Sequence, residues 1–521
     1  MNRHFLGTGR LLCALMMAGA AMAGDGAEAR QLEAPQVGAN EIELDALLTR
    51  EAWRVMRQLE PLDGQRIAGP VRASMDVATG LISVYFPREF LPADPEGRFE
   101  EQLDAFRHAL MEVSAPFVDG TGMQYRYGGR HLYFYFPRLE QEDEAARRGR
   151  RLASQATSAL VSAGHGYYRR LVSDSWVTQR EEHNGVLEDL ITPSYAEELQ
   201  RVLELRSEAT VYRARSTATE MHGPSGQEWW KVAGRYHLES QYPENPEIWN
   251  SLGSGAADDR HYKEDIRSRP LIANHHGSAV AIHLHTNAAA PAATGVRVIH
   301  QPEREQDREL GSRVLCYMSE LIHAVEGYEG FAVSPQPHAD DKGENRLAQM
   351  PSVIVEAAFH TNPDDALALQ DPNFRVAAMK GVEKGYRLWR EGKGCDPLKV
   401  DPIATISVAA GQSRVVDLAF AGFPQYPVVI ETKNVGCPPG WKCTDGAVAL
   451  PDADTRPAQI TLRCENAGSA PIYWDTRMVD DDGVKSPPVR HIVQCLRGAG
   501  VGASQAVYED DEGAATARRL P

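Results

Sequence analysis

The chain has 521 residues, of which 42% are hydrophobic and 24% charged, a composition typical of globular rather than fibrous or disordered proteins. At about 150 residues per domain, this length predicts two to four domains. The 55 Lys and Arg residues against 72 Asp and Glu give a net charge of -17, which argues against nonspecific binding to nucleic acid or anionic lipid, because both reward clustered basic charge.

The first 23 residues have the layout of a secretory signal peptide. Arg3 and Arg10 precede an apolar run over positions 11–22, and Ala-Met-Ala at 21–23 forms a cleavage site. The run is shorter than the ~20 apolar residues of a membrane span, and no later segment approaches that length. We therefore expect residues 1–23 to be removed from an exported protein, periplasmic or extracellular, without an integral membrane segment.

Export changes the interpretation of the cysteines. Seven minus Cys13 in the signal leaves an even number, which favours disulfide bonds in an oxidising compartment. The spacing of the closest pair is too wide for a zinc ribbon, and the sequence does not choose among the possible pairings. The six cysteines of the mature chain are Cys316, Cys395, Cys437, Cys443, Cys464 and Cys495.

The N-terminal part predicts a small α+β domain over residues 42–143, after an irregular leader over 24–42. Its aromatic residues are expected in the core rather than in a ligand site. The patterns predict helices over 47–59 and 99–113 and strands over 81–86 and 131–136.

Residues 145–395 predict an α/β domain with a mostly parallel sheet, because apolar runs alternate with amphipathic stretches. Asp371 and Pro372 mark the start of its last helix. A long insertion over 216–270 is expected to be functional or to carry its own helices. The predicted strands are 159–162, 209–212, 279–284, 296–299 and 352–356, and the predicted helices are 194–204, 305–325 and 374–389.

The C-terminal part predicts an all-β, sandwich-like domain over residues 401–497. Short β-type runs follow one another with turn residues between them at about 8 to 12 residue intervals. Four of the six mature cysteines lie here. The Gly-, Ala- and acid-rich tail over 498–521 is expected to be disordered.

Polar residues that could act in catalysis or metal binding follow the predicted strands of the middle domain. His165 lies between two glycines directly after the first strand, at the sheet edge where ligand sites form. Taken alone, this segment favours a histidine in an ordinary glycine-rich turn. Glu188 lies at the start of a predicted helix, where acidic residues are common, and Asp189, Glu181 and Glu182 are near rivals.

Two further strands carry such residues. His283 and His285 share one face of a buried strand; His285 lies nearer the carboxyl end and is the better ligand, with His283 in the core or supporting it. Glu356 ends an apolar strand, where a buried carboxylate must be paired with a cation or protonated, unless the strand ends one residue earlier and leaves it in solvent. Asn362 and Pro363 then open a helix.

Two histidines and a carboxylate can form a three-ligand zinc site with an open fourth position, the arrangement of catalytic zinc. A further glutamate beside the metal is what amide hydrolysis requires, since it takes a proton from water and passes it to the leaving amine.

These motifs, over about residues 157–392, resemble those of the zinc-dependent N-acetylmuramoyl-L-alanine amidases of the amidase_3 type. The resemblance implies that His165, Glu188 and His285 bind Zn²⁺, that Glu356 is the catalytic acid/base, and that peptidoglycan is the substrate. The chain departs from the family at 162–163, where Ser-Ala replaces Asp-Pro, and at position 167, where Tyr replaces Gly. The matching segments are Gly164-His-Gly166, Glu188, His285-Thr-Asn287 and Val355-Glu-Ala-Ala-Phe-His-Thr-Asn-Pro363.

Two alternatives remain open: a catalytically inactive wall-binding or scaffold protein, and a zinc peptidase that acts on the stem peptide. Loss of the signal's two arginines moves the net charge from -17 to -19. An acidic protein gains little long-range attraction to an anionic wall, so we expect recognition to depend on the zinc and short-range contacts. Protein partners and the roles of the flanking domains are not predicted.

Overall fold

A computed structural model describes residues 37–149, 157–253, 255–455 and 457–497. The predicted signal peptide over 1–23, the leader over 24–36 and the tail over 498–521 lie outside the described residues. Within the described ranges, no helix is both long enough and apolar enough to cross a membrane.

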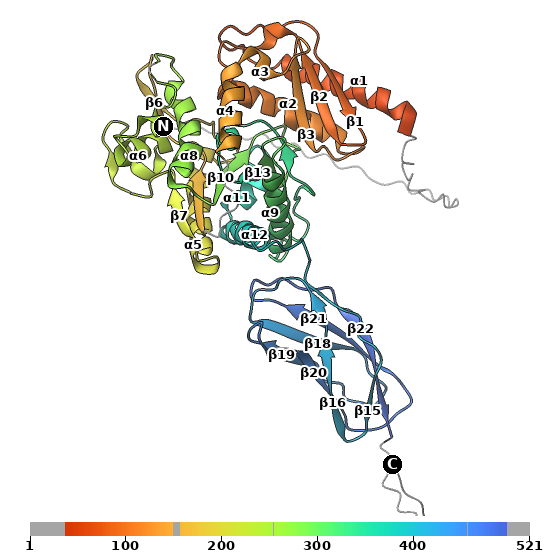
Figure 1. Cartoon of the computed structure of the whole chain (residues 1–521). Coiled ribbons are helices and arrows are strands. Elements are labelled where there is room, and N and C mark those ends of the chain that lie inside the picture. The colour runs from red at the N-terminus through yellow and green to blue at the C-terminus, as the bar shows by residue number, and fades with distance from the viewer. Residues whose placement is uncertain (1–36, 150–156, 254, 456, 498–521) are drawn as a thin grey trace, which may run out of the picture.

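The N-terminal unit packs two helices on a short sheet (Figure 1). Its core is rich in aromatic side chains, as the sequence predicts, with Phe86 stacked on Phe90 at 4.1 Å between ring centroids. The elements are α1 (Val37–Met56), β1 (Arg72–Asp76), β2 (Leu81–Phe86), the short 3-10 helix η1 (Arg88–Phe90), α2 (Arg98–Ser114), β3 (Gly122–Tyr127), α3 (Leu132–Tyr135) and α4 (Pro137–Arg148).

Two predictions for this unit are wrong. Residues 37–42 belong to helix α1 rather than to an irregular leader. The aromatic segment 131–136 is not a strand: it contains the helical turn α3, capped by the Nδ1 atom of His131, which accepts from the Tyr133 amide. Phe134 is 62% exposed, so the alternation of residue types does not correspond to one buried face. Pro137 then starts α4 immediately, which leaves no room for a strand.

The three N-terminal strands do not form a separate sheet. They extend the middle sheet through a single pairing of Gly122 with Ala339, giving nine strands in the order β1-β2-β3-β12-β11-β13-β10-β4-β7. Most neighbours are parallel, as predicted, but β11 runs antiparallel to β13. The middle strands are β4 (Ser158–Ala163), β7 (Thr210–Arg213), β10 (Val280–Asn287), β11 (Arg297–His300), β12 (His338–Ala339) and β13 (Ser352–Phe359).

Helices cover both faces of this sheet. One face packs its apolar residues, such as Ile282 and Val355, against α5 (Glu188–Arg206), α9 (Glu305–Ile322) and α12 (Pro372–Arg390). Alternate residues such as Ala281 face α8 (Arg260–His276) on the opposite side. Side chains at positions 283, 285, 354 and 356 therefore project on the α8 side.

The remaining elements of the middle part are short. The 216–270 insertion carries helices of its own, which was one of the two possibilities expected for a connection of this length. Asp371 caps α12 with Pro372 at its first position, as predicted. These elements are β5 (Tyr168–Arg170), β6 (Ser175–Val177), β8 (Met221–His222), β9 (Gln227–Glu228), the 3-10 helix η2 (Trp229–Lys231), α6 (Gly234–Gln241), α7 (Pro246–Trp249), α10 (Gly343–Arg346) and α11 (Pro363–Gln370).

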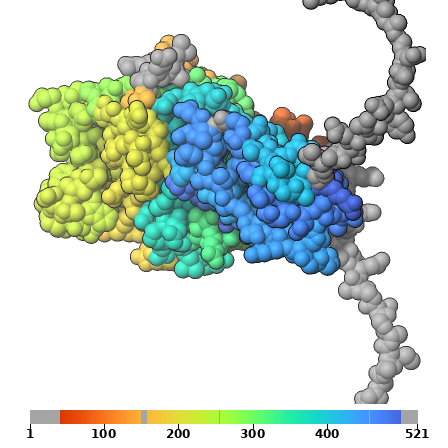
Figure 2. Space-filling model, turned by 90° about the horizontal axis from the view of Figure 1, so that it is seen from below, coloured from red at the N-terminus to blue at the C-terminus, as the bar shows by residue number. Residues whose placement is uncertain are grey.

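The C-terminal part is β-rich, as predicted, and lies below the middle part in Figure 1. In Figure 2, seen from below, this blue unit lies in front of the middle part. Ion pairs join the two parts, since Arg206 and Lys380 both pair with Asp482 at 2.7 Å. The exact domain limits stay a prediction. Its strands are β14 (Lys399–Val400), β15 (Ile406–Ala409), β16 (Gln412–Leu418), β17 (Phe420–Ala421), β18 (Val428–Gly436), β19 (Gly446–Leu450), β20 (Ala458–Cys464), β21 (Ile472–Val479) and β22 (Val489–Leu496).

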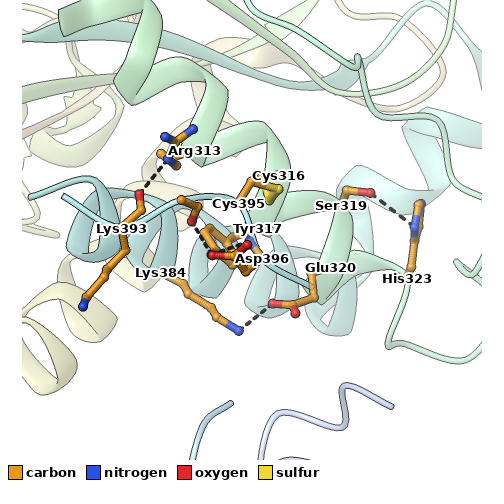
Figure 3. The surroundings of a disulfide bond; sticks show 11 residues. Arg313, Cys316, Tyr317, Ser319, Glu320, His323, Lys384, Lys393, Cys395 and Asp396 are labelled. Atoms are coloured by element: carbon orange, nitrogen blue, oxygen red, sulfur yellow. Dashed lines mark hydrogen bonds and ion pairs between the residues drawn. A yellow bond between two sulfur atoms is a disulfide. The ribbon is translucent and has the colours of Figure 1, made fainter. Parts of the chain in front are cut away.

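All six cysteines of the expected mature chain are paired. Cys316 on α9 bonds to Cys395, just after α12, and so joins two neighbouring segments of the middle part (Figure 3). The C-terminal part holds Cys437–Cys443 and Cys464–Cys495. The prediction of disulfides therefore agrees with the structure, which also supplies the pairing that the sequence left open.

Candidate active site

Three of the predicted site residues lie together on the α8 side of the sheet. His285 Nδ1 is 3.1 Å from His165 Nε2 and 3.0 Å from Glu188 Oε1. The third separation, from His165 Nε2 to Glu188 Oε1, is 3.3 Å. All three residues are buried, and one ligand atom from each lies within 4.8 Å of the others, so a single metal ion could contact all three.

The backbone around His165 permits this close approach. His165 itself has a left-handed backbone with φ 61°, held between Gly164 and Gly166. A Cβ atom at Gly164 would lie 2.6 Å from the His285 ring, so a side chain there would push the two histidines apart. The glycine before the histidine is therefore part of the site's geometry.

Gln179 and Asp265 orient the His165 ring. His165 Nδ1 lies 2.8 Å from Gln179 Oε1, and Gln179 Nε2 donates to Asp265 Oδ2 at 2.9 Å. Because the amide oxygen can only accept, the Nδ1 atom carries the proton, and the lone pair of Nε2 faces Glu188 and His285.

Glu344 orients the second histidine in the same way. His285 Nε2 lies 3.0 Å from Glu344 Oε2, on the side of the ring away from the other ligand candidates. Arg269 donates to Glu344 at 2.5 Å and to Asp265 at 2.5 Å. One buried chain of polar contacts therefore supports both histidines, and metal-binding histidines are commonly held by such outer partners.

No sequence motif marks these supporting residues, so they were not among the predicted site residues. His283, considered for the core or a supporting role, is fully buried, with Nδ1 3.6 Å from Glu344 Oε1, and neither of its ring nitrogens has a hydrogen-bond partner among the described residues. Among the rivals of Glu188, Asp189 accepts from the backbone amides of Gly166, Gln179 and Arg180, which gives it a structural role. Glu181 and Glu182 are exposed.

The charges around His285 fit a cation. Burial opposes ionisation, but Glu344 and Glu188 raise the pKa of His285 to about 10. Burial likewise opposes the charge of Glu188, but His165 and His285 hold its pKa well below the usual range. Two carboxylates around one imidazole thus require a positive charge, which either a proton or a metal ion can provide.

Glu356 lies beside the three candidate ligands. It is the direct neighbour of His285 across the parallel pair β10 and β13, and it is 8% exposed. The strand continues to Phe359, so the alternative of a solvent-exposed Glu356 beyond the strand end is wrong. Among the described residues its Oε2 atom has no hydrogen-bond partner. Burial raises the pKa of Glu356 to about 7, which suits a group that exchanges protons near neutral pH.

The four residues line a cavity of about 340 Å³ whose opposite wall comes from the N-terminal unit. That wall is α2, with Glu100, Asp104 and His108. Arg180 joins the two walls: it contacts Glu101 of α2, and its Nε atom lies 3.6 Å from Glu188 Oε2. The N-terminal unit is therefore part of the cavity that contains the candidate site.

Comparison with known proteins gives one family match. Residues 159–386 match the Amidase_3 family model, described as N-acetylmuramoyl-L-alanine amidase. The search of curated proteins found no match.

Solved structures similar to the chain include three amidases. The CwlD amidase from Clostridioides difficile, in complex with the GerS lipoprotein, is 14% identical with a TM-score of 0.31, covering 46% of this chain and 100% of that one. An N-acetylmuramoyl-L-alanine amidase from Clostridium difficile 630 is 16% identical, with a TM-score of 0.30 and the same coverages. Ami1 from Mycobacterium smegmatis is 12% identical, with a TM-score of 0.31, covering 47% and 100%.

Proposed function

From the match of residues 159–386 to the N-acetylmuramoyl-L-alanine amidase family model, we propose that the protein is an exported zinc hydrolase. Its substrate is peptidoglycan, and it cleaves the amide bond between N-acetylmuramic acid and L-alanine. The six paired cysteines support export, because disulfides persist in oxidising compartments.

One observation carries the proposal: His165 Nε2, Glu188 Oε1 and His285 Nδ1 converge beside Glu356 in one cavity. These three residues would hold the zinc, in the two-histidine, one-carboxylate set of catalytic zinc sites. When bound, zinc supplies a positive charge that lowers the pKa of water and polarises the amide carbonyl.

Glu356 is the proposed acid/base. Its Oε2 atom, which lacks a partner within the described part of the chain, is placed to accept a proton from water. The water oxygen adds to the carbonyl carbon of the amide as it loses this proton, and the same carboxyl then donates the proton to the amide nitrogen as the C–N bond breaks, so that the amine leaves neutral and the acyl group leaves as a carboxylic acid. A pKa of about 7 allows both halves of this transfer at neutral pH.

Digestion of purified sacculi tests the proposal. The mature chain, loaded with zinc, should release peptides that begin with a free L-alanine and should leave glycan strands intact, as seen by mass analysis. Cleavage inside the stem peptide would show the zinc peptidase instead. A protein that binds no zinc and stays inert when zinc is added would show the inactive wall-binding alternative.

A further inference from the structure

A second pocket adjoins the cavity of the candidate site. Its volume is about 270 Å³, and His108 lines both spaces. One wall consists of α2 and the loop after it, including Met111 and Asp119. The other consists of the middle sheet and its loops, including Arg297 and Phe359. The pocket therefore exists only where the N-terminal unit meets the sheet.

Arg297 lies next to the proposed acid/base. On the antiparallel pair β11 and β13, Arg297 is the direct partner of Glu356. Directly opposed residues of such a pair project on the same face with Cβ atoms ~5 Å apart. The Arg297 guanidinium lies 5.7 Å from the centroid of the Phe359 ring. The side chain thus leaves the strand on the same face as Glu356 and extends to the second pocket, so a group bound by Arg297 would lie on the same face of the sheet as Glu356.

Within the described part of the chain, Arg297 lacks the close carboxylate partner that the neighbouring cations have, although the charges of Asp365 and Asp119 act on it from farther away. Its guanidinium donates to the Val296 carbonyl at 3.4 Å, and the described residues offer it no carboxylate at ion-pair distance. In the first cavity, by contrast, Arg269 pairs with Glu344 at 2.5 Å and Lys342 with Asp104 at 2.7 Å.

The other titratable residues of the second pocket do not supply positive charge. Burial lowers the pKa of His108 to about 3, and burial with the nearby Arg297 holds the pKa of His338 well below its usual range. Glu112 and Asp119 also line the pocket, but both are exposed to solvent. Arg297 is thus the one cation among the described residues that line this pocket.

We propose that this second pocket binds a free carboxylate of the stem peptide, held by Arg297, while the scissile amide lies at Glu356. The inference rests on the proposed function. The carboxyl of muramic acid is consumed in the scissile amide, so an anion that enters the pocket next to the site comes from the peptide side. The nearest is the free α-carboxylate of the second residue, a γ-linked D-glutamate; the carboxylates of the third residue are the other source.

Matched substrates test this subsite on the zinc-loaded mature chain. Two soluble disaccharide tripeptides differ only at the second residue, D-glutamate in one and D-isoglutamine in the other; a third is amidated at the third residue instead. The wild type should favour the carboxylate over the amide by about 10- to 100-fold in kcat/KM, since a charge-assisted hydrogen bond is lost. Arg297→Gln should raise KM for the D-glutamate substrate and remove the preference, while Arg297→Lys should keep part of it.

Arg308→Gln is the matched control, because it removes the same charge from the exposed surface of α9. It should retain the wild-type preference. Preference that follows the third residue would support the subsite and assign the anion to that residue. Equal wild-type rates on all three substrates, or an unchanged preference in Arg297→Gln, would overturn the inference.

Calorimetric binding of the free tripeptides separates this inference from the proposed function. The D-glutamate tripeptide should bind the wild type more tightly than the D-isoglutamine tripeptide, and Arg297→Gln should remove the difference. A protein that shows this difference but hydrolyses no substrate would contradict the amidase proposal alone. Equal binding of both peptides would count against Arg297.

Discussion

Glu344 holds His285 from behind: the carboxylate lies 3.0 Å from Nε2, while Nδ1 of the same ring faces His165 and Glu188. An imidazole that donates through one nitrogen presents the lone pair of the other. The contact thus fixes both the orientation of the ring and the atom available to a metal. Arg269 and Asp265 extend it to Gln179 and the His165 ring.

Glu344→Gln should weaken zinc binding. The substitution keeps the shape of the side chain but removes the negative charge behind His285, and loss of such an outer partner costs about 10- to 100-fold in metal affinity. Competition with a chromophoric chelator measures the affinity directly. Glu326→Gln, on the exposed loop after α9, is the control and should leave the affinity unchanged. Equal affinities of Glu344→Gln and wild type would contradict the role of Glu344.

Glu356→Gln should separate zinc binding from turnover. Glu356 is proposed to move protons rather than to bind zinc, so the variant should keep its zinc and lose about 10²- to 10⁴-fold in kcat. His165→Ala and His285→Ala should lose both zinc and activity, because each removes one of three ligands. Metal analysis and turnover of the same preparations provide the check. A near-normal rate for Glu356→Gln would exclude it as the acid/base.

The pH dependence of kcat/KM should show an acid limb from Glu356. Burial raises its pKa to about 7, so the carboxyl is protonated below that pH and cannot accept a proton from water. Activity should fall as the pH drops below about 7, and the acid limb should not affect activity at higher pH. Bound zinc would lower the pKa of its neighbour, which places the limb at or below about 7. A profile that stays flat down to about pH 5 would contradict the assignment.

The candidate site was predictable because its residues follow strands. His165, His285 and Glu356 occur at or near the carboxyl ends of apolar runs, and parallel strands bring those ends together. The two-residue spacing of His283 and His285 along one strand also predicted that they share a face, as the structure has them. The antiparallel direction of β11 was not predictable, since an apolar run of four residues carries no direction.

The supporting residues were hidden for a physical reason. Asp265 and Arg269 are four residues apart on α8, a spacing that usually indicates an exposed ion pair on a helix surface. Both are instead buried against the sheet, because the insertion folds back over it and the pair finds Gln179 and Glu344 as partners. Only the tertiary arrangement distinguishes such a buried network from a solvated helix face.

The Cys316–Cys395 bond should stabilise the part of the chain that carries the site. It closes a loop with a sequence separation of 79, whereas Cys437–Cys443 closes one of 6. Loop-closure entropy then predicts that replacing the first pair with serines costs about 4.5 kcal/mol and the second about 2 kcal/mol. The first pair also joins α9 to the segment after α12, so its loss should lower the urea concentration at which amidase activity disappears.

The Cys437/Cys443 double variant is the control: its bond lies in the C-terminal β-rich part, so it should keep the wild-type midpoint for activity. Equal activity midpoints in both double variants would show that the Cys316–Cys395 bond does not protect the site.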